Sequence, residues 1–132
     1  MARLLIIDDD RSMLELLRVH LKAVGHVVRT APDAADGIRA ILAEPPELIL
    51  SDVAMPYLDG IELLRALRSD PLTRRIPVIF LTGRTDDDTL VKARQLGVDD
   101  FLTKPIQVED LLSSIEKVLK RSRPSEDLRP LN

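Results

Sequence analysis

Residues 48–60, LILSDVAMPYLDG, decide the fold, because an apolar run that needs burial ends there abruptly in Asp52. Further short apolar runs occur at residues 4–7, 27–28, 78–81 and 101–102. Most of the runs are continuous rather than alternating, which is typical of strands that are covered on both faces. The chain is therefore expected to contain five strands.

Helical spacing fills the stretches between these runs. Apolar residues recur at intervals of three and four near residues 13–21, 33–43, 61–67, 86–96 and 108–119. Gly25 and Gly97 stand where two helices would end, and Asp33 is a plausible N-cap. Five strand–helix repeats predict an α/β fold of the (βα)5 type, with a doubly wound, five-stranded parallel sheet and helices on both faces. The domain is expected over residues 1–121, with a tail or the start of a linker at residues 122–132.

Composition narrows the class of protein. A length of 132 residues suits one domain, and a charged fraction of 31% argues against disorder and against a membrane protein. The chain has no cysteine, so disulfides, thiolate metal sites and cysteine nucleophiles are excluded. The formal charge of −3, without a basic face, argues against direct binding of nucleic acid. No run is long enough for a membrane span or for the core of a signal peptide, so a cytoplasmic location is expected.

Polar side chains follow the predicted strands at the point where each strand ends. They are Asp8-Asp9-Asp10, Ser51-Asp52, Thr82-Gly83 and Thr103-Lys104-Pro105. Taken singly, each has an ordinary explanation, because acidic and hydroxyl residues commonly cap helices. In an open parallel sheet, however, the carboxyl ends of the strands share one edge, where ligands bind. Their joint occurrence therefore predicts a site.

Three carboxylates, from Asp8, Asp9 and Asp52, would repel one another in such a site unless a cation lay among them. Oxygen ligands with room for water suit Mg²⁺. Lys104 could bind one oxygen of a phosphoryl group, and the Thr82 hydroxyl could donate to another. An aspartate in this setting can act as a nucleophile and form an aspartyl phosphate.

The segments IIDDD, LILSDVAMPYLDG, PVIFLTG and DDFLTKP resemble, in order and spacing, the four signature segments of receiver domains of two-component response regulators. The resemblance covers residues 3 to about 120 and implies the strand order 2-1-3-4-5. It implies Asp52 as the phosphoacceptor and Asp9 as a direct Mg²⁺ ligand. It further implies Asp8 as a ligand acting mainly through water, and the backbone carbonyl of Ala54 as another ligand. Asp10 matches no site position and is interpreted as the start of the first helix.

The resemblance also assigns a switch. Thr82 would move toward the phosphoryl group, the rotamer of Phe101 would follow, and Lys104 would hold a phosphate oxygen, aimed by a cis peptide bond between Lys104 and Pro105. A core aromatic is the alternative for Phe101. Val91 and Val108 are assigned with Phe101 to the face formed by the fourth helix, fifth strand and fifth helix, or else to the core. The Met55-Pro56 and Asp59-Gly60 pairs are interpreted as turn residues.

By this resemblance the chain receives a phosphoryl group from a sensor histidine kinase or a phosphotransfer protein and regulates an output domain or effector that the sequence does not name. It catalyses only its own phosphorylation and dephosphorylation, so we do not class it as an enzyme. Two variable positions beside the site hold Ala54 and Arg84. Because Ala54 cannot orient a water molecule, we hypothesise slow self-dephosphorylation, and Ala54→Asn is expected to shorten the phosphoryl lifetime. Ser113-Ser114 stands where dimerising relatives carry a basic residue, which weakens the case for a symmetric dimer but leaves a phosphorylation-dependent dimer open.

Three other classes of protein are alternatives to a receiver domain. Phosphatases that form an aspartyl phosphate carry a second aspartate two residues after the nucleophile, where this chain has Ala54. Nucleotide- and flavin-binding modules are disfavoured because neither G-x-x-x-x-G-K nor G-x-G-x-x-G is present. A pseudo-receiver or docking module without phosphorylation keeps the fold, but the intact set of site residues argues against it.

Overall fold

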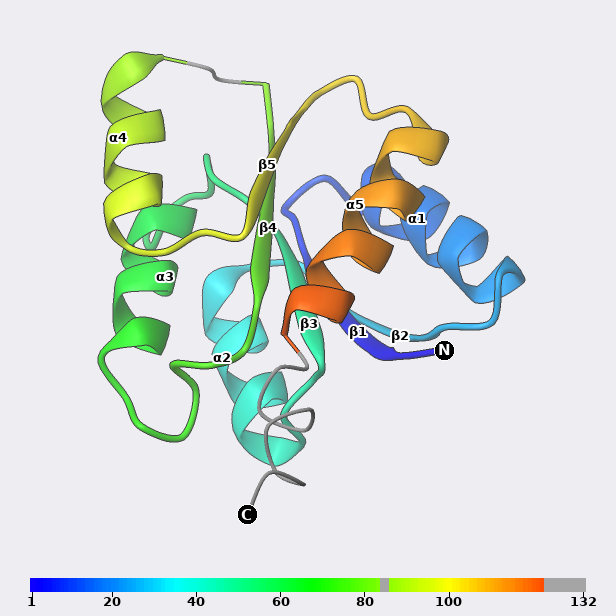
Figure 1. Cartoon of the computed structure of the whole chain (residues 1–132), viewed down its shortest axis with the longest axis horizontal. Helices are drawn as coiled ribbons and strands as arrows, with labels where there is room; N and C mark the ends of the chain where they lie inside the picture. Colours follow the sequence, from blue (N-terminus) through cyan, green and yellow to red (C-terminus); the bar gives the residue numbers. More distant parts are fainter. Residues whose placement is uncertain (84–85, 123–132) are drawn as a thin grey trace.

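The computed structural model describes residues 1–83 and 86–122, in which strands and helices alternate along the chain (Figure 1). The elements are β1 (Arg3–Ile7), α1 (Arg11–Ala23), β2 (Val27–Ala31), α2 (Ala34–Ala43), β3 (Leu48–Asp52), α3 (Gly60–Arg68), β4 (Val78–Thr82), α4 (Asp87–Gln95), β5 (Asp100–Thr103) and α5 (Val108–Arg121). This order confirms the predicted (βα)5 arrangement. Arg84 and residues 123–132 lie outside the described residues, so the tail stays a prediction.

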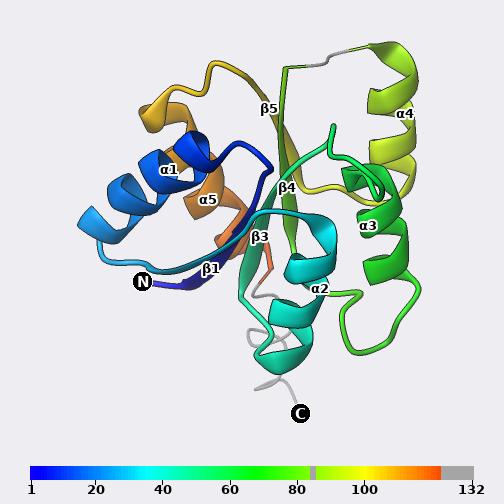
Figure 2. The ribbon, with the colours of Figure 1, turned by 180° about the vertical axis from the view of Figure 1, so that it is seen from behind.

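The five strands form one parallel sheet in the order β2-β1-β3-β4-β5. This order confirms the 2-1-3-4-5 sheet that the family resemblance implied. Helices α1 and α5 cover one face, and α2, α3 and α4 cover the other, as two opposite views show (Figures 1 and 2). Successive residues of a strand point to opposite faces, so Leu4 and Ile6 pack under α1 and α5, while Leu5 and Ile7 pack under the other three helices.

Burial on both faces holds only for the inner strands. Every residue of β3 and β4 is buried, whereas β5 has no buried residue and Val27 of β2 is 61% exposed. The expectation that most strands are covered on both faces is therefore right for the inner strands and wrong for β2 and β5. These two strands form the edges of the sheet, where one side lacks a neighbouring strand and the covering helices end.

Aspartates begin the first four helices. The Asp10 carboxylate accepts hydrogen bonds from the backbone N–H groups of Ser12 and Met13, which confirms Asp10 as the start of α1. Asp33 caps α2 as predicted, and Asp59 and Glu62 form a reciprocal capping box at α3. Such caps satisfy N–H groups that the helix leaves without partners. They also fix where each helix starts after its strand, at the edge of the sheet that carries the candidate site.

Candidate functional site

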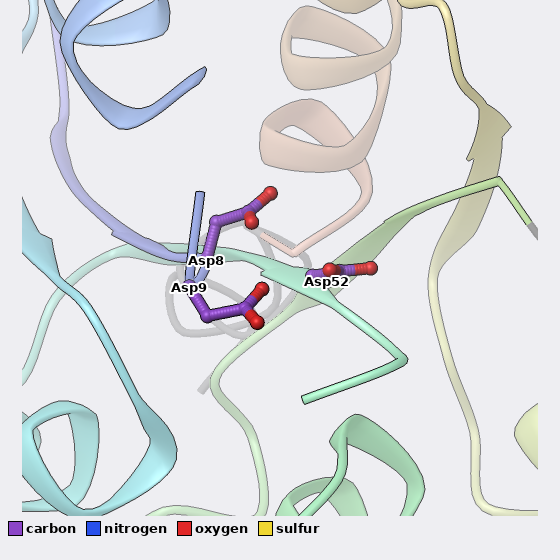
Figure 3. Close-up of side chains that lie close together, drawn as sticks. All are labelled: Asp8, Asp9 and Asp52. Carbon is purple, nitrogen blue, oxygen red and sulfur yellow. The ribbon is translucent and has the colours of Figure 1, made fainter. Parts of the chain in front are cut away.

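Three carboxylates gather at the carboxyl edge of the sheet (Figure 3). Asp8 and Asp9 directly follow β1, and Asp52 is the last residue of β3. Each offers an oxygen atom, and these oxygens lie within 4.8 Å of one another. Asp8 is 1% exposed and Asp52 is 7% exposed, whereas Asp9 is open to solvent. The cluster that the sequence predicted from separate strand ends is thus present in space.

Lys104 lies beside the two buried carboxylates. Its Nζ atom is 2.9 Å from Oδ2 of Asp8 and 3.5 Å from Oδ2 of Asp52. It follows β5, its backbone N–H donates to the carbonyl of Thr82 at 2.7 Å, and the peptide bond to Pro105 is cis. Sequence reasoning assigned Lys104 to a phosphoryl oxygen and missed its pairing with Asp8. The signal was available, since a buried carboxylate needs a partner of opposite charge.

The charges of the cluster are not balanced. Burial raises the pKa of Asp52, and the negative charge of Asp8 raises it further, while Lys104 and the backbone N–H groups of Ala54 and Val53 lower it. Burial lowers the pKa of Lys104, but the hydrogen bond and charge of Asp8 and the charge of Asp52 outweigh this, so its pKa is raised. Lys104 therefore stays protonated, and negative charge remains in excess.

The donor set fits Mg²⁺. All three side chains offer carboxylate oxygens, which a hard divalent cation prefers. Ligands on opposite sides of an octahedral Mg²⁺ lie roughly 4 Å apart, close to the 4.8 Å within which the three oxygens gather. The exposed position of Asp9 leaves room for the water molecules that Mg²⁺ retains. Ala54 is also exposed, and the role of its carbonyl as a ligand stays a prediction.

Thr82 and Phe101, the two residues assigned to the switch, lie on neighbouring strands. Thr82 is fully buried at the end of β4. Phe101 on β5 is only partly buried, and its ring meets that of Phe80 edge-on, with centroids 6.2 Å apart. Phe101 also lines a cavity of about 380 Å³ between α4 and β5, together with Leu90, Arg94, Val98, Asp99, Asp100 and Thr103. Phe101 thus packs against the core without being enclosed by it.

The face formed by α4, β5 and α5 is partly apolar. Val91 is 49% exposed, so its alternative assignment to the core is wrong. The reason is that α4 packs lightly, with Ala93 as its buried residue. Val108 is half-buried at the start of α5. Ser114, noted for replacing a basic residue, is buried and donates a hydrogen bond to the carboxylate of Asp100.

The connection from β3 to α3 contains a tight turn. Tyr57 is fully exposed and has a φ of 71°, in the left-handed region, and the N–H of Leu58 donates to the carbonyl of Pro56 at 2.9 Å. A turn of this kind with a positive central φ is rare and strained. The N–H of Gly60 then donates to the carbonyl of Val53 at 2.8 Å, which closes the connection. Sequence reasoning predicted a turn here but not its closure.

Within residues 1–83 and 86–122, no helix has both the length and the apolar character that crossing a bilayer requires. The cytoplasmic location stays a prediction.

Comparison with known proteins gives one consistent family. A family model described as the response regulator receiver domain matches residues 4–116. Response regulator MprA of Mycobacterium avium (strain 104) is 37% identical over 125 residues, covering 95% of this chain and 54% of that protein. The phosphate regulon transcriptional regulatory protein PhoB of Pseudomonas aeruginosa is 34% identical over 128 residues, covering 97% of this chain and 56% of that protein.

Solved structures agree with this result. A CheY-like response regulator receiver domain protein from Methanospirillum hungatei JF-1 superimposes with a TM-score of 0.89 at 30% identity, covering 95% of this chain and 98% of that one. The chain spans about half the length of the curated relatives named above.

Proposed function

Because the chain belongs to the response regulator receiver domain family, we propose that it is a phosphoacceptor switch of a two-component phosphorelay, with Asp52 carrying the phosphoryl group. One observation carries the assignment to Asp52. Its carboxylate is buried at the carboxyl edge of the sheet, next to Asp8 and Asp9, with the Lys104 ammonium 3.5 Å away. This combines a nucleophile, a place for a metal ion and a fixed cation in one cluster of side chains.

In the proposed reaction, an oxygen of Asp52 attacks the phosphorus of a phosphohistidine on a sensor histidine kinase or phosphotransfer protein. The P–O bond forms as the P–N bond breaks, and the electron pair of the P–N bond returns to the imidazole nitrogen. Mg²⁺, held by Asp8, Asp9, Asp52 and the Ala54 carbonyl, would neutralise charge on the phosphoryl oxygens. Lys104 would bind one of those oxygens as a point charge, and the Thr82 hydroxyl would donate to another.

The proposed output is a change in the face formed by α4, β5 and α5. Thr82 lies two residues after Phe80 on β4, and β4 pairs with β5 so that Phe80 lies opposite Phe101 and Thr82 opposite Thr103. A shift of Thr82 toward the phosphoryl group would bias the Phe101 ring between its present packing and the cavity beside it. Phosphorylation would then act by shifting a pre-existing equilibrium. An output domain or effector protein would detect the change at this face, where Val91 is exposed.

Incubation with Mg²⁺ and acetyl phosphate, followed by intact mass measurement, tests the phosphoacceptor. We expect a gain of one phosphoryl group in the wild-type chain, no gain in Asp52→Ala, and no gain after addition of EDTA. Asp88→Ala, which removes an exposed carboxylate from α4, is the matched control and should behave as wild type. Absence of any gain in the wild-type chain would favour the docking module without phosphorylation, and a gain that survives Asp52→Ala would place the group elsewhere.

Methyl NMR of Val91 tests the switch. Phosphorylation should shift the Val91 methyl signals in the wild-type chain, and Thr82→Ala should reduce the shift at least severalfold while leaving phosphorylation at Asp52 detectable by mass. An undiminished shift in Thr82→Ala would contradict the proposed coupling.

A further inference from the structure

The start of α3 is pressed against the strand end that carries Asp52. The backbone of residues 53–60, here called the metal loop, is closed at its base by the hydrogen bond from Gly60 to Val53. A Cβ atom placed on Gly60 would lie 2.6 Å from the backbone oxygen of Asp52, 2.8 Å from Cα of Val53 and 3.1 Å from Cε1 of Phe80. The two shortest of these contacts are with backbone atoms, which cannot rotate away as a flexible side chain could.

The surroundings of Gly60 have little freedom to yield. Phe80 is fully buried and its ring is held edge-on against Phe101. On the helix side, the capping box of Asp59 fixes the first turn, and Leu63 and Leu64 are buried in the core. A methyl group at position 60 would therefore displace the backbone of residues 52–53, which carries the phosphoacceptor and leads to Ala54.

Backbone conformation does not explain why residue 60 is a glycine. The described glycines with positive φ are Gly25 and Gly97, and Gly60 is not among them. Glycine is also less favourable than alanine in a helix. The close approach of α3 to the strand is the feature of this position that requires the absence of a side chain.

We propose that Gly60 is a positioning residue for metal binding, because it sets where the Asp52 carboxylate and the Ala54 carbonyl lie relative to Asp8 and Asp9. This inference rests on the proposed function, which gives the metal loop its role. Glycine at position 60 acts through the backbone of Asp52 and Val53 and contacts neither the metal nor the phosphoryl group.

Three glycine-to-alanine variants of the whole chain separate this role from a general effect on folding. Gly60→Ala places the methyl group against the site backbone. Gly37→Ala places it 2.6 Å from Cδ1 of Ile7, a core side chain on the face under α2, so it strains the core without touching the metal loop. Gly83→Ala adds a methyl group that meets nothing within 4 Å.

The measurement is the Mg²⁺ dissociation constant from calorimetric titration, paired with urea unfolding in EDTA for each variant. We expect Gly60→Ala to weaken Mg²⁺ binding at least tenfold. Gly37→Ala should lower the unfolding midpoint but keep the dissociation constant within about twofold of wild type, and Gly83→Ala should change neither. Wild-type Mg²⁺ affinity in Gly60→Ala would overturn the inference, as would an equal loss of affinity in Gly37→Ala.

A second pair of variants keeps the test decisive if Gly60→Ala does not fold. Asp59→Ala removes the cap that fixes the first turn of α3 at the end of the metal loop, and Asp33→Ala removes the corresponding cap of α2, far along the chain from the loop. Asp59→Ala should weaken Mg²⁺ binding about threefold and Asp33→Ala should not, and equal affinities in the two variants would overturn the inference. Failure of the proposed function is distinguishable, because it would appear as absence of phosphorylation in a wild-type chain whose Mg²⁺ affinity still depends on Gly60.

Discussion

Strand β5 has an ionic cluster at each end, and the two clusters are built differently. The amino-end cluster consists of Arg68, Asp99 and Arg121, and the carboxyl-end cluster consists of Asp8, Asp9, Asp52 and Lys104. Asp99 precedes β5, and its carboxylate accepts hydrogen bonds from Arg68 at 3.2 Å and from the backbone N–H of Val78 at 2.8 Å. Lys104 follows β5 and is shared between two carboxylates.

At the amino end, the one carboxylate of the cluster, Asp99, has a cationic partner in Arg68. The Arg68 guanidinium also donates to the backbone carbonyls of Arg74, Ile76 and Gly97, and Arg121 donates to the carbonyl of Asp99. This cluster joins α3, β4, β5 and α5 through satisfied hydrogen bonds. The carboxyl end keeps unbalanced negative charge. One end of the strand therefore holds the fold together, while the other keeps charge that a bound cation would neutralise.

Mg²⁺ should have the largest effect on stability, because its binding would neutralise the excess negative charge of the carboxyl-end cluster. At a free concentration about one hundred times the dissociation constant, a ligand that binds only the folded state stabilises it by about 2.7 kcal/mol. We expect that gain in urea unfolding of the wild-type chain and of Arg68→Met, whose change lies at the other end of β5. Asp9→Asn should lose most of the gain, and an undiminished gain in that variant would refute the assignment of the metal to the carboxyl end.

Arg68→Met should have the next largest effect. Its replacement removes the charged donor of the Asp99 carboxylate, which keeps the Val78 N–H, and the side-chain donor of three backbone carbonyls. A lost hydrogen bond to a charged group costs about 2 kcal/mol. We expect a loss of that size in the free energy of unfolding in urea, with or without Mg²⁺. Arg75→Met, at an exposed arginine between α3 and β4, should change stability little. Equal losses in the two variants would mean that the amino-end cluster does not hold the fold together.

Asp52→Asn should change the free energy of unfolding by less than Arg68→Met does, and it should raise that free energy rather than lower it. Burial, followed by the charge of Asp8, raises the pKa of Asp52 in the folded chain. The folded state therefore binds this proton more tightly than the unfolded state, so the ionised carboxylate costs stability at neutral pH. Without Mg²⁺, Asp52→Asn should be more stable than wild type at neutral pH. The gain should shrink as pH falls through the raised folded pKa toward the unfolded value, because the wild-type carboxylate then becomes protonated.

Urea midpoints of both proteins across this acidic range provide the measurement, and their difference cancels the titration of the other carboxylates to first order. A difference that stays constant with pH, or that favours the wild-type chain at neutral pH, would show that the carboxyl end is already balanced.

The two clusters also differ in how far the sequence could predict them. Thr82 directly follows an apolar run, and Asp52 and Lys104 each follow one after a single polar residue. Parallel topology brings such positions to one edge of the sheet. Arg68, Asp99 and Arg121 stand at ordinary charged positions far apart in the chain, with no periodicity or motif to relate them. Their association depends on where α3 and α5 end relative to β5, which only the folded chain defines.

The sequence also could not predict how closely each helix packs against the sheet. Val91 lies at helical spacing in an apolar pattern, but spacing cannot tell how closely a helix approaches its sheet. Helices α3 and α4 each have 9 residues, yet α3 buries Gly60 and four leucine or isoleucine side chains, whereas α4 buries Ala93. Asp59-Gly60 has the composition of a turn, and the contact that gives Gly60 its role is with a strand backbone rather than with its neighbours in sequence.

The strained turn at Tyr57 has a spectroscopic consequence. Tyr57 is the single tyrosine of the chain, and there is no tryptophan. Its ring is fully exposed and belongs to the loop that leads from Asp52 to α3. All tyrosine emission from the unlabelled protein therefore originates within the metal loop. Quenching and anisotropy of that tyrosine emission therefore report on the loop alone, without any label.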